Sequence, residues 1–155
     1  MRAAAALLAL ALSLPAAALA EAPLPDGWRA IQTAKPYATL LSDLKAAVRA
    51  ERMGLVTEAG PTEVAKKRGF DIPGNRVVGV FRNDYAVRIL GLSEDAMIEA
   101  PIRFYVTERE GGARLAWKRP SAVFAPYADQ GGAALAEAAA EIDAVFDAIA
   151  AAAVE

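Results

Sequence analysis

The chain has 155 residues, of which 17 are basic and 19 acidic, and 55% are hydrophobic. It contains neither histidine nor cysteine, which excludes disulfides, zinc–thiolate sites, thioether-linked haem and any reaction that needs an imidazole or a thiolate. The nearly balanced charge gives no indication of nucleic-acid binding.

Residues 1–20 have the three parts of a secretory signal peptide: Arg2, an apolar run and a small-residue end. The pattern predicts cleavage between Ala20 and Glu21, because signal peptidase accepts only small side chains before the cut; Ala22 offers a second position. The apolar run of about a dozen residues is shorter than the roughly 20 of a membrane-spanning helix. We therefore expect export to the periplasm of a Gram-negative cell, with no stable membrane insertion after cleavage.

The remaining 135 residues carry 16 basic and 19 acidic side chains, a net charge of −3. This length fits one domain with a single core, and without cysteine that core must be stable through packing alone. We expect a lead and first strand at 21–34, then a single domain at 35–155 that ends in an alanine-rich helix over 131–153.

Six elements are predicted in the first part of the chain, in this order: a strand over 28–33, a helix from 36 to 53, a strand over 55–59, a short helix that Gly60 and Pro61 open and that runs through Val64 to Arg68, a strand over 76–81 and a helix over 84–90. Pro36 begins the first helix and Gly54 ends it as a left-handed cap. Asn83 is the expected cap of the third helix, and Gly91 its end. The strand over 76–81 is apolar on both alternating faces, which predicts an interior position in the sheet. A loop leads from there to Pro101.

The next segment predicts a β-hairpin, because apolar and polar residues alternate on both sides of a glycine turn at 110–112. Phe104 and Val106 would share the core face with Leu115 and Trp117. The second strand ends before Pro120, and a connection over 123–127 follows.

The last segment predicts a long helix with one buried stripe, because Leu135, Ile142 and Ile149 recur every seven residues. Residues 131–155 also hold five acids and no base. We expect these acids to remain solvated or to meet basic residues such as those at 66–68.

Several short motifs follow one another along the chain: Leu44-x-x-x-Val48 before Met53-Gly54, Lys67-x-Gly69-Phe70, Phe81-x-Asn83-x-x-Ala86, Ala100-Pro101-Ile102-Arg103-Phe104, Glu108 before the glycine turn, and Trp117-x-x-Pro120-Ser121. In this order and spacing, the chain resembles the domain of unknown function 302 family from about Lys35 to Pro120. The resemblance implies an α+β fold like that of the TATA-box-binding protein group, with an antiparallel sheet in β-α-β(4)-α order and helices on one face. It also implies a tendency to form homodimers, and it brings no settled activity and no catalytic residues.

The chain departs from the family pattern after the last strand. Many members have a basic residue followed by histidine there, whereas this chain has Val123-Phe124-Ala125-Pro126-Tyr127. No role that depends on that histidine carries over.

Catalytic candidates are sparse. Ser121 could pair with Lys118, but a solvated strand end explains both residues, and no serine lies in a Gly-x-Ser-x-Gly context. The carboxylates Glu58, Glu99 and Glu108 are typical of exposed edges or of arginine partners. We therefore assign no catalytic residue, no metal site and no cofactor, and expect a binding module rather than an enzyme. The alternative is an enzyme or redox accessory protein that uses carboxylate, lysine or tyrosine chemistry.

The acidic residues at 94–99 lack the alternating spacing of a calcium loop, and haem ligation by Met53 or Met97 has no supporting motif. The more informative feature is the polar face of the hairpin. Arg103 and Tyr105 project from one strand, with Lys118 expected on its neighbour. This face is either solvated or a recognition surface, and we assign ligand binding to Arg103, Tyr105 and Lys118. The expected partners are a small anionic ligand or a periplasmic protein, and a second copy of the chain. Arg76, Arg82 and Arg88 could extend such a patch.

Overall fold

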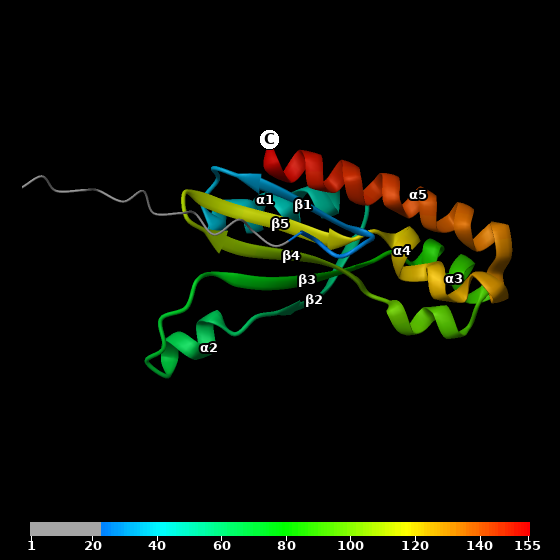
Figure 1. Cartoon of the computed structure of the whole chain (residues 1–155), viewed down its shortest axis with the longest axis horizontal. Helices are drawn as coiled ribbons and strands as arrows, with labels where there is room; N and C mark the ends of the chain where they lie inside the picture. The colour runs from blue at the N-terminus through cyan, green and yellow to red at the C-terminus, as the bar shows by residue number, and fades with distance from the viewer. Residues whose placement is uncertain (1–22) are drawn as a thin grey trace, which may run out of the picture.

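The computed structural model describes residues 23–155, so the expected signal peptide lies outside the described part of the chain. Its elements follow in this order: β1 (Trp28–Thr33), α1 (Tyr37–Ala50), β2 (Gly54–Ala59), α2 (Thr62–Lys67), β3 (Asn75–Phe81), α3 (Asn83–Leu92), η1 (Asp95–Glu99), β4 (Ile102–Arg109), β5 (Gly112–Lys118), α4 (Pro120–Phe124), η2 (Ala125–Tyr127) and α5 (Ala128–Val154). The strands form one antiparallel sheet in the order β1-β5-β4-β3-β2 (Figure 1). β3 is an interior strand, as predicted, and β1 and β2 are the edges.

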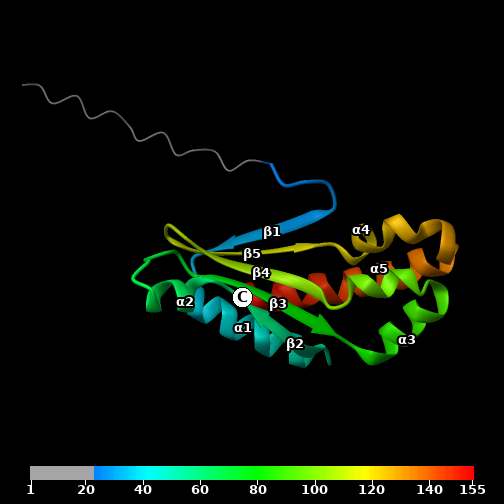
Figure 2. The ribbon, with the colours of Figure 1, turned by 90° about the horizontal axis from the view of Figure 1, so that it is seen from below.

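The two long helices lie on the same side of the sheet (Figure 2). α1 packs against β2, β4 and β5, and α5 packs against α1, α3 and the β1 edge. The predicted α+β class, the antiparallel sheet and the element order are confirmed. The likeness to the TATA-box-binding protein group stays a prediction. No helix within residues 23–155 is long and apolar enough to cross a membrane.

The core forms where the hairpin meets α5. Phe104 pairs with Trp117 and Val106 with Leu115 across β4 and β5, which is the predicted register. The ring of Phe104 stacks on Phe146 of α5 at 4.5 Å and lies 5.9 Å from the ring of Trp117. Hairpin and terminal helix are therefore joined by buried aromatic contacts.

The terminal helix buries the stripe that its spacing predicts, including Leu135, Ile142 and Ile149. It begins at Ala128, before the expected start, and bends at Gly132, whose φ is 56°. The stretch before it, read as a plain connection, contains α4 and η2. These two short helices were not predicted, because the proline and aromatic residues of the stretch indicate a connection rather than a helix.

Three expected boundaries are wrong. α1 closes at Arg52, which takes the left-handed conformation with φ 58°, while Gly54 is the first residue of β2. The reason is that Met53 donates back to the carbonyl of Val48 and enters the core. Asn83 is the first residue of α3 without a side-chain cap, and the helix continues through Gly91 to Leu92. The loop expected next holds the turn η1.

Candidate functional site

A groove of about 590 Å³ lies on the sheet face opposite α1 and α5. Its floor comes from β1, β5, β4 and β3, and η1 and α4 contribute one wall. We call it the sheet-face groove, defined by these lining residues: Trp28, Asn75, Val77, Glu99, Ile102, Arg103, Tyr105, Lys118 and Val123. All three residues assigned to ligand binding from the sequence therefore line one hollow.

Strand alternation explains how Arg103 and Lys118 come together. Phe104 and Trp117 are a cross-strand pair that faces the core, so the residues just outside this pair face the groove from adjacent strands. Neither the Arg103 nor the Lys118 side chain forms an ion pair or hydrogen bond within residues 23–155. Two cations thus lie side by side without an acidic partner.

The polar groups of the groove are already oriented. Tyr105 lies opposite Val77 of β3, and its hydroxyl accepts a hydrogen bond from the Asn75 amide at 2.5 Å. At the η1 wall, the hydroxyl of Tyr127 donates to Glu99 at 2.9 Å. This hydrogen bond raises the pKa of Tyr127 above its ordinary value, because the carboxylate favours the protonated phenol. One carboxylate oxygen of Glu99 therefore accepts a hydrogen bond from Tyr127 at the η1 wall, away from the groove floor.

The remaining lining is apolar. Trp28 lies opposite Lys118 in the register of β1 and β5, and Val77, Ile102 and Val123 complete the lining. Trp28 and Asn75 are absent from the candidates that the sequence offers, and Glu99 is among them only as a carboxylate typical of an exposed edge. The strand order decides their placement, and nothing in the sequence indicates that β1 pairs with β5 rather than with β2.

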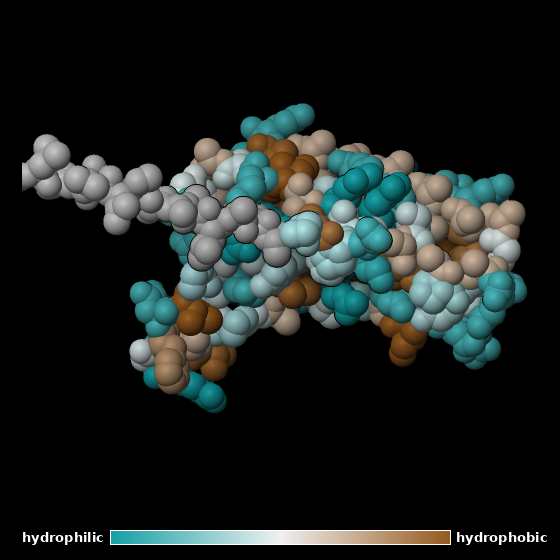
Figure 3. All heavy atoms as spheres, in the orientation of Figure 1, coloured by the Kyte–Doolittle hydropathy of each residue, from teal (hydrophilic) through white to brown (hydrophobic). Residues whose placement is uncertain are grey.

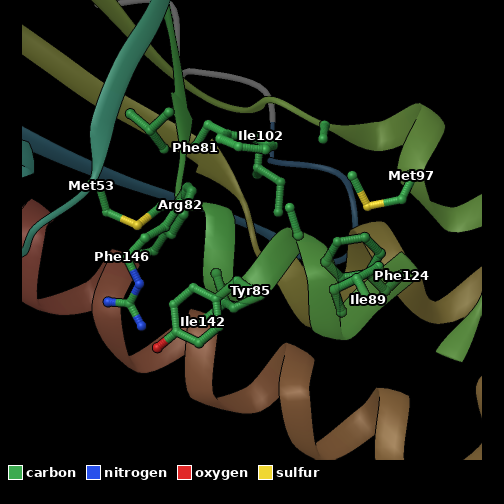
Figure 4. A pocket seen from close by; sticks show the side chains of 13 residues that line it. Met53, Phe81, Arg82, Tyr85, Ile89, Met97, Ile102, Phe124, Ile142 and Phe146 are labelled. Atoms are coloured by element: carbon green, nitrogen blue, oxygen red, sulfur yellow. The ribbon is translucent and has the colours of Figure 1, made fainter. Parts of the chain in front are cut away.

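A second hollow lies between β3, α3 and α5 and is almost entirely apolar (Figure 4). At its rim the guanidinium of Arg82 stacks over the Tyr85 ring at 3.7 Å and donates to Asp84 at 2.8 Å. This hydrogen bond raises the pKa of Arg82 and lowers that of Asp84. The hollow encloses about 40 Å³, well below the roughly 150 Å³ that holds a benzene molecule. Met53 and Met97 both line it, and haem does not fit there.

Ser121, the serine considered as a catalytic candidate, is hydrogen-bonded to a buried ion pair. Ser121 donates its hydroxyl to Asp143 at 2.6 Å and its backbone N–H to the same carboxylate at 2.9 Å. Arg119 binds Asp143 at 2.5 Å. The Ser121 hydroxyl therefore faces an acid held by an arginine, and it has no lysine base.

Two of the three candidate carboxylates are structural partners. Glu58 binds Lys45 at 2.6 Å and approaches Arg76 at 4.0 Å, on the helix side of the sheet. Glu108 accepts a hydrogen bond from the backbone N–H of Gly74 at 2.6 Å. Only Glu99 lies in the groove. Within the described residues, no three acids gather into a metal-binding cluster.

The arginines that could have extended this surface do not join it. Arg76, Arg82 and Arg88 each bind a different carboxylate, on Glu58, Asp84 and Glu141 respectively. The bond to Glu141, at 2.7 Å, raises the pKa of Arg88. Two acids of α5, Glu141 and Asp143, pair with Arg88 and Arg119 rather than with the basic residues at 66–68.

Comparison with solved structures finds this fold in the crystal structure of an uncharacterized conserved protein, DUF302, from Bacillus stearothermophilus. The two share 17% identity and superpose with a TM-score of 0.73, over 84% of this chain and 100% of that chain. The family model described as Domain of unknown function DUF302 matches residues 29–149. The chain belongs to the DUF302 family. This confirms the resemblance drawn from the motifs.

Comparison with curated proteins finds no match. In this DUF302 chain the segment after β5, where many relatives are expected to have histidine, packs into the fold instead. Val123 and Phe124 are buried, and Tyr127 holds Glu99 at the groove wall. The segment therefore shapes the groove and supplies no imidazole to it.

Proposed function

We propose that this DUF302 protein is an exported, periplasmic binding module that holds a small anionic organic ligand in the sheet-face groove without transforming it. The observation that carries the proposal is the pair Arg103 and Lys118, adjacent on two strands, in a hollow of about 590 Å³, with no acidic partner within residues 23–155.

Adjacent cations on neighbouring strands repel each other and destabilise the sheet. An anion bound between them would remove this repulsion and gain charge-assisted hydrogen bonds from both. Glu99 leaves the groove with a net charge of about +1, which favours a monoanion over a highly charged ligand.

The rest of the groove indicates the shape of the ligand. Tyr105 and Asn75 offer neutral hydrogen-bonding groups, and Trp28 with Val77 offers apolar surface. Small-molecule sites combine such apolar walls with a few polar groups that fix orientation. We infer a ligand with one carboxylate or phosphate group on a planar or aliphatic body.

Variants of the two cations test this function, with benzoate as the probe ligand because it joins one carboxylate to a planar body. Arg103→Ala and Lys118→Ala should each weaken benzoate binding about 10- to 100-fold, because each removes a charge-assisted hydrogen bond worth about 1.5–3 kcal/mol. Isothermal titration calorimetry measures the affinity. Benzamide has the shape of benzoate without its charge, and it should bind more weakly than benzoate to the wild-type protein.

Arg29→Ala is the matched control, because Arg29 is an exposed arginine of β1 that pairs with Trp117 and so faces away from the groove. Its affinity should equal that of the wild type. The proposal fails if the Arg29 variant loses as much affinity as the Arg103 variant. If the Arg29 variant keeps its affinity and the Arg103 variant loses it, native mass spectrometry of the protein purified from the periplasm should identify the resident anion.

A further inference from the structure

A projection beyond the β2 edge exposes apolar side chains. It consists of α2 and the residues on either side of it, and we call residues 61–73 the α2 projection. None of the residues of α2 is buried. Val64 on α2 is 53% exposed, and Phe70 just after the helix is 66% exposed. Figures 1 and 3 show the projection standing off from the body, with hydrophobic and hydrophilic atoms mixed on its surface. Exposed apolar residues gathered in one place indicate an interaction surface, whereas residues scattered singly do not.

The end of α2 fixes where Phe70 lies. Gly69 takes the left-handed conformation with φ 83°, and the N–H of Phe70 donates to the carbonyl of Ala65 at 3.0 Å. The N–H of Gly69 donates to the carbonyl of Lys66 at 3.1 Å, which completes a Schellman motif. This motif typically sets the residue after the glycine against the last turn of the helix, here the turn that contains Val64 and Ala65. The two most exposed large apolar side chains of the projection therefore belong to one small surface.

Three consecutive cations border this apolar surface: Lys66, Lys67 and Arg68. All three are exposed, and none forms an ion pair within residues 23–155. Lys67 and Arg68 follow Val64 by three and four residues, so they lie on the same side of the helix as Val64. The two acids of the projection lie elsewhere, Glu63 in the first turn of α2 and Asp71 in a hollow shared with the β4–β5 turn. The last turn of α2 is therefore both basic and apolar.

The other end of the molecule combines exposed apolar side chains with the opposite charge. Val87 and Leu90 of α3 are more than half exposed, and Ile98 of η1 is 81% exposed. Residues 94–99 hold three acids and no base. Figures 1 and 2 agree that α2 and α3 lie at opposite ends of the molecule. A negatively charged surface would attract the α2 projection and repel the other end, so it would orient the molecule.

We propose that the α2 projection docks on a bilayer that contains anionic phospholipid, with Phe70 and Val64 entering the interface and the cations at 66–68 meeting the lipid phosphates. Apolar side chains that enter the headgroup region beside Lys or Arg are the combination that peripheral membrane-binding elements use. A specific protein interface needs about 800 Å² and about 20–30 residues on each partner, more than residues 61–73 supply. A small protruding tip can instead enter a bilayer.

This docking is peripheral, since no helix within residues 23–155 could cross the membrane. It does not depend on ligand binding in the sheet-face groove, which lies on β1, β5, β4 and β3.

Flotation with lipid vesicles tests the docking. The protein used is residues 21–155, which contain every element of the fold and lack the apolar run that would bind lipid by itself. It should bind vesicles of phosphatidylglycerol and phosphatidylcholine in equal amounts, and stay in solution with phosphatidylcholine alone. Lys67→Gln with Arg68→Gln should lower the partition coefficient about 25-fold, because each cation near an anionic surface contributes about 5-fold. Phe70→Ala should lower it about 5-fold, through lost apolar insertion.

Two matched variants are the controls. Arg29→Gln with Arg49→Gln removes the same two charges from exposed positions on β1 and α1. Ile98→Ala removes an exposed apolar side chain from the acidic end. Both should bind anionic vesicles as the wild type does, and circular dichroism confirms the fold of each variant.

Phe70→Trp separates insertion from charge attraction alone. The emission of the added indole should shift to the blue on anionic vesicles, while the wild-type emission, from Trp28 and Trp117, stays unchanged. An unshifted emission from this variant would contradict insertion of the tip.

The proposal is overturned if phosphatidylcholine alone binds the protein equally well, or if the Arg29 and Arg49 variant loses as much binding as the Lys67 and Arg68 variant. Loss of vesicle binding in Arg103→Ala alone would overturn it too, because the lipid phosphate would then lie in the groove. Protein that binds neither vesicle, but forms dimers that Phe70→Ala dissociates in sedimentation velocity, would overturn it in favour of a second copy.

Discussion

Asp143 is 4% exposed, yet it carries a charge on the inner side of α5. Its carboxylate binds the Arg119 guanidinium, the Ser121 hydroxyl and the Ser121 backbone N–H, which is an otherwise unpaired donor in the first turn of α4. One side chain therefore joins the end of β5, the start of α4 and the terminal helix.

Asp143→Ala should lower the free energy of unfolding by about 2–3 kcal/mol, because it leaves Arg119 and the backbone N–H of Ser121 without their acceptor. Asp147→Ala, an exposed position on the same helix, should change it by less than about 0.5 kcal/mol. Urea denaturation of the two variants makes the comparison. Equal losses would show that the buried cluster contributes no special stability.

The bond from Tyr127 to Glu99 predicts a dependence on alkaline pH. The folded state raises the pKa of Tyr127 above 10.0, so it holds the phenolic proton more tightly than the unfolded chain does. The stability that this bond contributes is present below pH 10 and is lost as pH rises through the folded pKa. The melting temperature of Tyr127→Phe should lie below that of the wild type at pH 8, and the gap should close above about pH 10. A gap that stays constant across this range would contradict the assignment.

At the scale of elements, the connection between α2 and β3 depends on close approach of the backbone. A side chain at Gly74 would meet the ring of Tyr37 at 2.5 Å, whereas the space at Gly91 of α3 is open. Gly74→Ala should destabilise the protein by about 1–3 kcal/mol. Gly91→Ala should stabilise it by about 0.5–1 kcal/mol, because alanine favours the helix. Thermal unfolding measures both, and a Gly74→Ala protein as stable as the wild type would show that this connection can relax.

The elements that the sequence predicts well are those whose pattern is set by one buried face. Alternation in β4 and β5 gives the register of Phe104 with Trp117, and seven-residue spacing gives the buried stripe of α5. Helix ends were predicted less well, because tertiary contacts decide them. α1 ends at Arg52 because Met53 turns into the core, and α3 continues through Gly91 without a break.

At the scale of the whole molecule, the groove could be predicted only in part. Alternation alone places Arg103 and Tyr105 on one face and makes Lys118 their neighbour across the hairpin. Trp28 enters the groove because β1 pairs with β5, and Glu99 enters because η1 folds back over the sheet end. Both depend on contacts between distant segments, for which a single sequence carries no local pattern.

The two tryptophans provide the most direct test of the groove as the binding site. Trp28 lines the groove, whereas Trp117 is buried on the core face of the same sheet. An NMR titration with benzoate can follow both indole N–H resonances in one spectrum. We expect a saturable shift of the Trp28 resonance with little change at Trp117, and no saturable shift in Arg103→Ala at the same concentrations. An unmoved Trp28 resonance, or an equal response in the Arg103 variant, would contradict it.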